Sequence, residues 1–132
     1  MSQPSRIAIR ADVDIITARQ RGRTLAAELG FQKTDLALIA TAISELARNI
    51  LTYAGEGEIE LALDHRMGRG AIVVVARDRG PGIGDIALAL QDGYSTSGSL
   101  GIGLPGVRRL MDEFELSSAK GAGTTVRATK WR

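Results

Sequence analysis

Residues 57–78 read GEIELALDHRMGRGAIVVVARD, two strand-like runs on either side of a polar HRMGRG turn. Alternating polar and apolar residues in the first run and glycines between the runs are typical of a β-hairpin. The second run, 71–77, is apolar on both faces, which indicates a central strand covered on at least one face by helices. We therefore expect a sheet built around this hairpin.

The segments before the hairpin predict one strand and two helices. SRIAIRA, residues 5–11, reads as a short first strand. An amphipathic helix follows from about Asp12 and ends near Gly30. Thr34 or Asp35 can cap a second, longer helix that runs to about Tyr53.

The segments after the hairpin complete the expected fold. We expect a short helical stretch at about 85–91, a helix near 104–113, and two closing strands, FELSSA at 114–119 and TTVRATKW at 124–131, joined by a KGAG turn. This order favours an α+β two-layer sandwich, with a mixed β-sheet and helices on one face.

Length and composition are those of one soluble domain, residues 1–132. Hydrophobic residues make up 44% and charged residues 24% of the chain, and there is no cysteine. The longest apolar run, AIVVVA at 71–76, is too short to cross a bilayer, and the first residues lack a secretory signal. We expect a cytoplasmic protein with no membrane association.

The chain is rich in arginine, with a net charge of +2. Its densest basic cluster, RQRGR at 19–23, falls on the first expected helix. The residues of that helix at three- and four-residue spacing, which predict its buried face, are Ile15, Ala18, Gly22, Leu25 and Leu29. The arginines therefore face outward without interleaved aromatic residues, which favours a solvated or protein-docking face over nucleic-acid binding.

A glycine-rich loop, SGSLGIGLPG, occupies residues 97–106 and leads into a helix. Its apolar flanks favour a phosphate-binding loop at a helix N-terminus over a flexible linker. GIGLPG at 101–106 matches G-x-G-x-x-G, but DGYSTSGS precedes it instead of an apolar strand, so a dinucleotide fingerprint is disfavoured. Gly-Leu-Pro in place of Gly-Lys-Ser/Thr excludes an ordinary P-loop.

Three further motifs carry candidate chemistry. In SELARN, Glu45 and Asn49 lie one helical turn apart and could present a base and a neutral oxygen ligand, of the kind Mg²⁺ accepts, to one site. Asp78 follows the buried strand and could accept a hydrogen bond from an exocyclic amine such as that of adenine, although an ordinary turn containing Pro81 is as good an interpretation. KGAGTT at 120–125 is most simply a hairpin turn, whose threonine could join Asp78 only if the two strands lie side by side.

SELARN, DRGPG, GSLGIGLPG and GAGTT together resemble, in order and spacing, the N, G1, G2 and G3 boxes of the GHKL (Bergerat-fold) ATPases. That family has the α/β sandwich expected above. AISELARNI with YAGEGEIE, DGYSTSGSLGIGLPGVRRLMDEF and the final Thr-Lys-Trp narrow the resemblance to the serine/threonine switch kinases of the bacterial stressosome.

The resemblance implies ATP and Mg²⁺ as ligands and a role for each matched residue. Glu45 would be the general base, Asn49 would coordinate Mg²⁺, and Asp78 would recognise the adenine amine, with Thr124 assisting. The glycines and apolar residues that would shape the base pocket or bring amides to the phosphates are Gly80, Gly82, Gly98, Leu100, Gly101, Ile102 and Gly103. Arg48 would be a cation for the transferred phosphate or, equally, an outward surface arginine.

The resemblance also implies partners: STAS-domain proteins as substrates and, after release, a PP2C-type phosphatase that the kinase activates. A nucleotide-gated anti-sigma factor that sequesters a sigma factor is the alternative, because both classes share the nucleotide boxes. A histidine kinase is disfavoured, since no phosphoacceptor domain is present and His65 falls in the expected hairpin turn.

Overall fold

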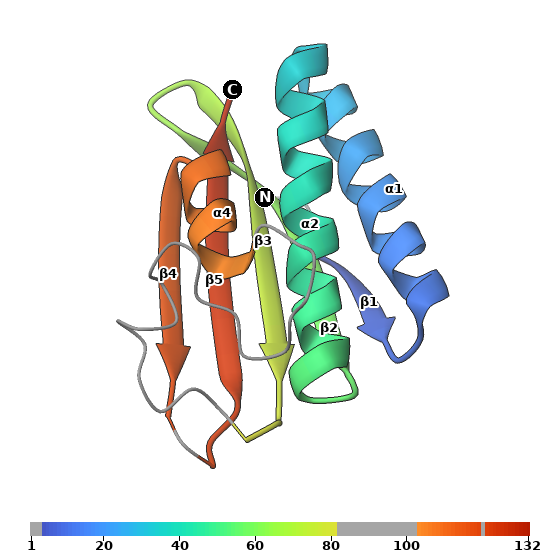
Figure 1. Ribbon diagram of the computed structural model, residues 1–132. Coiled ribbons are helices and arrows are strands. Elements are labelled where there is room, and N and C mark those ends of the chain that lie inside the picture. Colours follow the sequence, from blue (N-terminus) through green and yellow to red (C-terminus); the bar gives the residue numbers. More distant parts are fainter. Residues whose placement is uncertain (1–3, 82–102, 120) are drawn as a thin grey trace.

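The computed structural model describes residues 4–81, 103–119 and 121–132, and over these the chain forms one sheet with helices packed against one face (Figure 1). The strands are β1 (Ser5–Ile9), β2 (Gly57–Arg66), β3 (Arg69–Asp78), β4 (Glu113–Ser118) and β5 (Thr124–Trp131). The helices are α1 (Asp12–Leu29), α2 (Lys33–Tyr53) and α4 (Gly103–Leu110). The expected α+β two-layer sandwich is confirmed.

The strand order is β1-β2-β3-β5-β4, and each of the four neighbouring pairs is antiparallel. Our expectation of a mixed sheet is therefore wrong over the described residues. β4 runs in the same direction as β3, but β5 lies between them. The chain passes through α4 before it enters β4. It then returns through a hairpin into β5, which fills the space between β3 and β4, so that no two of the described strands are hydrogen-bonded parallel neighbours.

α2 is the helix on which the layers are assembled, because it packs against α1, α4 and the strands β2 and β3. Its apolar stripe is buried, with an exposure of 2% or less at Ile39, Ile43, Leu46, Ala47 and Ile50. On the facing side of the sheet, Ile59, Leu61 and Val74 are equally buried. One apolar layer between helices and sheet therefore holds the fold together.

The other face of the sheet carries charged side chains over a buried centre. Val73 and Val75 alternate with the helix-facing residues of β3, yet they are only 4% and 6% exposed. Arg6 pairs with Glu60 across β1 and β2 at 3.1 Å, and the register places Glu60 beside Val75. Long charged side chains can cover apolar surface with their aliphatic stems while their heads stay in water.

Several element boundaries differ from those expected. α2 begins at Lys33, earlier than a cap at Thr34 or Asp35 would allow, because the backbone N–H of Leu36 already donates to the Gln32 carbonyl at 2.9 Å. α4 ends at Leu110 instead of 113, since the next residues turn into β4. β1 ends at Ile9, and the hairpin turn shrinks to two residues because β2 and β3 pair as far as Arg66 and Arg69. The helical stretch expected at 85–91 lies outside the described residues.

The start of α1 explains the shorter first strand. The backbone N–H groups of Arg10 and Ala11 donate to Oδ2 of Asp14 at 2.8 and 3.0 Å instead of pairing with a strand. The carboxylate thus satisfies donors just before the helix and also places a negative charge in its first turn, where the helix dipole favours it. The turn from β1 into α1 is fixed by these bonds.

We predict that Gly22→Val lowers the free energy of unfolding by about 1–3 kcal/mol. Gly22 is buried where α1 crosses α2, and a Cβ there would overlap with Cδ1 of Ile43, itself fully buried. Urea denaturation measures the change. Arg21→Ala, on the outward side of α1, is the control and should stay within about 0.5 kcal/mol of wild type. Equal stability of the two variants would contradict close packing at this crossing.

Candidate functional site

Asp78, the last residue of β3, lies between two strands that both contribute to its surroundings. The register pairs it with Gly57 at the start of β2 and with Thr124 at the start of β5. The expectation that the threonine of KGAGTT could stand beside Asp78 required these strands to be neighbours, and they are. Oδ1 of Asp78 accepts a hydrogen bond from the Gly80 backbone N–H at 2.9 Å, whereas Oδ2 has no such partner among the described residues.

Three glycines allow backbone to approach Asp78 from three directions. A Cβ on Gly57 would overlap with the Arg77 carbonyl oxygen, and one on Gly123 would overlap with the Asp78 carbonyl oxygen. A Cβ on Gly80 would lie 2.7 Å from the Cβ of Ala54, just beyond the end of α2. Bare backbone at Gly57 and Gly123 therefore packs directly against the end of β3, and Gly80 packs directly against the residue that follows α2.

Hydrogen bonds hold these segments in place. The Gly121 N–H donates to the Pro81 carbonyl at 2.5 Å and so ties the β4–β5 turn to the segment after β3. Ser118 donates to the Gly123 carbonyl at 2.9 Å, and its hydroxyl lies 2.8 Å from that of Thr124. Gly57, Ser118 and Gly123 were missed by sequence reasoning, since nothing local shows that their strand ends meet at Asp78.

The second half of the site is a row of polar residues on α2. Glu45 is only 7% exposed, and its Oε1 accepts a 2.6 Å bond from Nη1 of Arg48, one turn further along. Asn49 is partly buried and makes no hydrogen bond through its side chain within the described part of the chain. The Glu45 carboxylate, which Arg48 holds in place, and the Asn49 amide oxygen, which has no partner in this part of the chain, thus lie next to each other on α2.

Arg48 was expected to be either a cation for a transferred phosphate or an outward surface residue. Its side chain is 46% exposed, and the structure pairs it with Glu45. The guanidinium therefore orients the carboxylate in the absence of any ligand. Contact between Arg48 and a phosphate stays a prediction.

Gly80 connects the two halves of the site. It packs against Ala54 and lies close to the backbone of Tyr53 at the end of α2. Asn49 precedes Ala54 by five residues, which is about 7.5 Å along a helix axis. The end of β3 and the polar row of α2 therefore belong to one region of the molecule.

The glycine-rich loop is largely outside this description. Gly98, Leu100, Gly101 and Ile102 of this loop lie outside the described residues, as does Gly82. Gly103 opens α4 with φ of 65°, a left-handed conformation that glycine adopts without strain. Packing of α4 on α2 brings the end of this loop to the helix that carries Glu45 and Asn49.

Metal-binding capacity is limited in the part of the chain that is described. It contains no group of three or more histidine, cysteine, aspartate or glutamate side chains able to hold an ion. It also has no helix long and apolar enough to cross a membrane.

An open pocket of about 610 Å³ includes Asp78 and Gly57 in its lining, and the rest of the lining is mostly arginine and glutamate side chains. Arg77 pairs there with Glu58 at 3.2 Å, and Arg10 approaches Glu56 at 3.9 Å. Since these cations are already matched by carboxylates, the pocket has no clear preference for an anion.

Known proteins resemble the chain over nearly its whole length. Residues 9–130 match the family model of the histidine kinase-like ATPase domain. The serine/threonine-protein kinase RsbT of Bacillus subtilis is 53% identical over 131 residues, which cover 99% of this chain and 98% of the relative. An anti-sigma F factor of Caldanaerobacter subterraneus is 32% identical over 123 residues, covering 86% of this chain and 82% of the relative.

Solved structures agree on the fold. The RsbU and RsbW domains of a Mycobacterium tuberculosis protein superpose with a TM-score of 0.65 at 23% identity, over 99% of this chain and 33% of that chain. A mycobacterial sensor histidine kinase, MprB, gives a TM-score of 0.57 at 14% identity, over 99% of this chain and 97% of that chain. The Bergerat fold expected from the motifs is confirmed.

We predict that Gly123→Ala destabilises the protein by about 2–4 kcal/mol, whereas Gly121→Ala costs only about 1–2 kcal/mol. Both glycines have a positive φ, 76° and 80°, so both alanines carry the same backbone strain. Only the Cβ at 123 meets backbone, because nothing lies within 4 Å of a Cβ at 121. Equal losses in chemical denaturation would show that the approach to Asp78 is not close.

Proposed function

The chain belongs to the histidine kinase-like ATPase domain family, and from that premise we propose that it is an ATP-dependent serine/threonine-protein kinase. The observation that carries the proposal is 53% identity with a serine/threonine-protein kinase across 99% of the chain. The proposal is also supported by the positions of residues that match the family's motifs, at the end of β3 and on the adjoining part of α2.

The adenine base would bind at Asp78. Its Oδ2, which accepts no hydrogen bond from the described residues, can accept one from an exocyclic amine, and the close packing of Gly80 on Ala54 fixes the backbone beside it. Thr124 stands opposite Asp78 in the register, with its hydroxyl already joined to that of Ser118. This pair of hydroxyls could hold an ordered water or the base edge while Asp78 supplies the charge.

The phosphates would lie towards α2 and the glycine-rich loop. Backbone amides of Gly98, Gly101 and Gly103, with Leu100 and Ile102 between them, would contact the phosphate oxygens, and Gly82 would widen the base pocket. Asn49 fits Mg²⁺ because its amide oxygen makes no hydrogen bond within the described residues, and Mg²⁺ commonly takes its other ligands from phosphates and water. Bound there, Mg²⁺ would neutralise charge on the transferred group.

Glu45 would act as general base. Its carboxylate would take the proton from the acceptor hydroxyl while that oxygen bonds to the γ-phosphorus and the bond from phosphorus to ADP breaks. Arg48 holds Oε1 and so leaves Oε2 for the hydroxyl. Because phosphoryl transfer depends mostly on positioning, this orientation is a large part of what the protein contributes.

The partners belong to the finer part of the proposal. We infer that the substrates are STAS-domain regulators in a stressosome, that phosphorylation releases the kinase, and that the released kinase binds a PP2C-type phosphatase in a partner-switching module. Similarity to RsbT over almost the full length of both chains supports this.

An anti-sigma factor is the second candidate. The 32% identity with an anti-sigma F factor favours it, since such a protein would use the same nucleotide site to control sequestration of a sigma factor. The much higher identity with the kinase makes this the weaker alternative. A sigma factor that binds the protein with ATP but not with ADP would support it.

We predict that Glu45→Gln lowers the rate of STAS-domain phosphorylation by about 10²–10⁴-fold and leaves ATP affinity unchanged. Glutamine keeps the shape and the bond from Arg48 but cannot take a proton. Radiolabelled ATP measures transfer, and calorimetry measures affinity. Glu28→Gln is the control, because Glu28 is exposed on α1, and this variant should behave as wild type.

Two results would contradict these roles. Normal phosphorylation by Glu45→Gln would remove Glu45 as the base. Arg48→Ala should lower the rate while Arg48→Lys retains part of it; loss of ATP affinity in Arg48→Ala with an unchanged rate would instead assign Arg48 to the phosphates.

A further inference from the structure

The β2–β3 hairpin ends in a two-residue turn, Met67 and Gly68, between the paired residues Arg66 and Arg69. Both turn residues have positive φ, 54° and 78°, the geometry of a type I′ turn. Met67 is the one non-glycine residue with positive φ in the described ranges. Its side chain is also fully exposed, at 102%.

Met67 is unfavourable in two ways at once. Asparagine or glycine is the usual residue at this turn position, because a left-handed backbone is strained in most other residues. A methionine at this point also leaves an unbranched apolar side chain entirely in water. An exposed apolar residue alone needs no explanation, but one held in a strained backbone points to a use.

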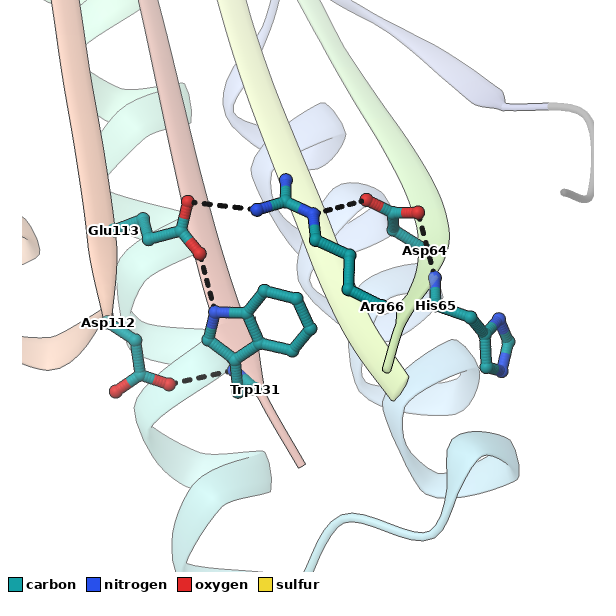
Figure 2. A network of polar contacts seen from close by, with 6 residues as sticks. All are labelled: Asp64, His65, Arg66, Asp112, Glu113 and Trp131. Carbon is teal, nitrogen blue, oxygen red and sulfur yellow. Dashed lines mark hydrogen bonds and ion pairs between the residues drawn. The ribbon is translucent and has the colours of Figure 1, made fainter. Parts of the chain in front are cut away.

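The turn is held rigidly by the strand ends beneath it (Figure 2). Arg66 reaches Asp64 at 3.3 Å and Glu113 at 3.6 Å, and it lies over the Trp131 ring at 5.1 Å. The indole N–H of Trp131 donates to Glu113 at 2.5 Å, and its backbone N–H donates to Asp112 at 2.7 Å. The hydrogen bond from the His65 backbone N–H lowers the pKa of the Asp64 carboxyl below its usual range, so the carboxylate that pairs with Arg66 stays charged.

The surroundings of Met67 are basic. The guanidinium of Arg69 also lies over the Trp131 ring, 5.7 Å from its centre. The same group donates to the Arg132 carbonyl at 3.2 Å. Within the described part of the chain, no carboxylate side chain lies in ion-pair distance of Arg69 or Arg132, and Arg132 donates to the Leu29 carbonyl. Arginine and tryptophan are also the residue types that most often dominate binding energy at protein interfaces.

The tip lies at the opposite end of the sheet from the ATP site (Figure 1). β3 runs from Arg69 at the tip to Asp78 at the site, and its ten residues span about 30 Å. A partner seated on the tip therefore leaves the site open and need not bring a hydroxyl to the phosphates. The tip suits a partner that is bound without being phosphorylated.

We propose that the hairpin tip, defined as Arg66, Met67, Gly68, Arg69 and Trp131, is a docking knob for a non-substrate protein. Met67 enters an apolar pocket on that protein, and acidic residues around the pocket meet Arg69 and Arg132. This rests on the proposed function, in which the non-substrate partner is the PP2C-type phosphatase.

The test uses the full chain with Met67→Asn, Met67→Leu and Arg69→Gln against the purified phosphatase and a STAS-domain substrate. Met67→Asn should raise Tm by about 2–6 °C, because asparagine suits the turn, and yet weaken phosphatase binding by about tenfold or more. Met67→Leu should retain most binding, since it keeps the apolar contact. Arg69→Gln should weaken binding and reduce its dependence on salt. Phosphorylation of the STAS domain should not change in any variant.

The outcomes separate this proposal from the one on which it rests. Wild-type protein that phosphorylates the STAS domain but never binds the phosphatase overturns the partner assignment and the docking proposal with it. If Met67→Asn binds the phosphatase as tightly as wild type does, the docking role of the tip is overturned, while the partner assignment stands. Binding to vesicles of equal parts phosphatidylcholine and phosphatidylglycerol that is lost in Met67→Asn, with phosphatase binding intact, would make the tip a membrane contact and also overturn it.

Discussion

The approach of bare backbone to Asp78 is the constraint on which the site depends. β2 and the β4–β5 turn come so close to the end of β3 that a methyl group would collide with its backbone, and the segment after β3 packs equally closely on the end of α2. The same contacts tie Asp78 to the helix that carries Glu45 and Asn49. One packing arrangement therefore positions the residues proposed for base recognition and those proposed for phosphate chemistry, and it rests on the apolar layer between helices and sheet.

The parts of this arrangement that depend on local pattern could be predicted from the sequence. Periodicity located the buried face of α1, including its buried glycine, and an apolar run identified β3 as central. The order of strands could not be predicted, because a crossover places β5 between β3 and β4 only when the whole sheet is assembled. For that reason Thr124 was a conditional candidate, whereas Gly57, Gly123 and Ser118 were not recognised at all.

Side-chain pairing was also beyond local reasoning. Spacing placed Arg48 next to Glu45 on the helix, but it did not show that the guanidinium would hold the carboxylate at 2.6 Å. At the other end of the sheet, HRMGRG read as an exposed turn, while the structure shows a tight turn braced by Trp131 from the distant C-terminal strand. One end of the sheet thus carries the proposed nucleotide site and the opposite end carries a basic tip, and β3 connects the two.

The most direct test of the central claim, that Asp78 and its glycine neighbours form an adenine pocket, is calorimetric comparison of ATP with GTP on the wild-type protein in the presence of Mg²⁺. A carboxylate can accept a hydrogen bond from the adenine amine but would face the carbonyl oxygen of guanine without a donor between them. The account predicts that GTP binds at least about tenfold more weakly, the cost expected for an unpaired charged group. Equal affinity for the two nucleotides would contradict it.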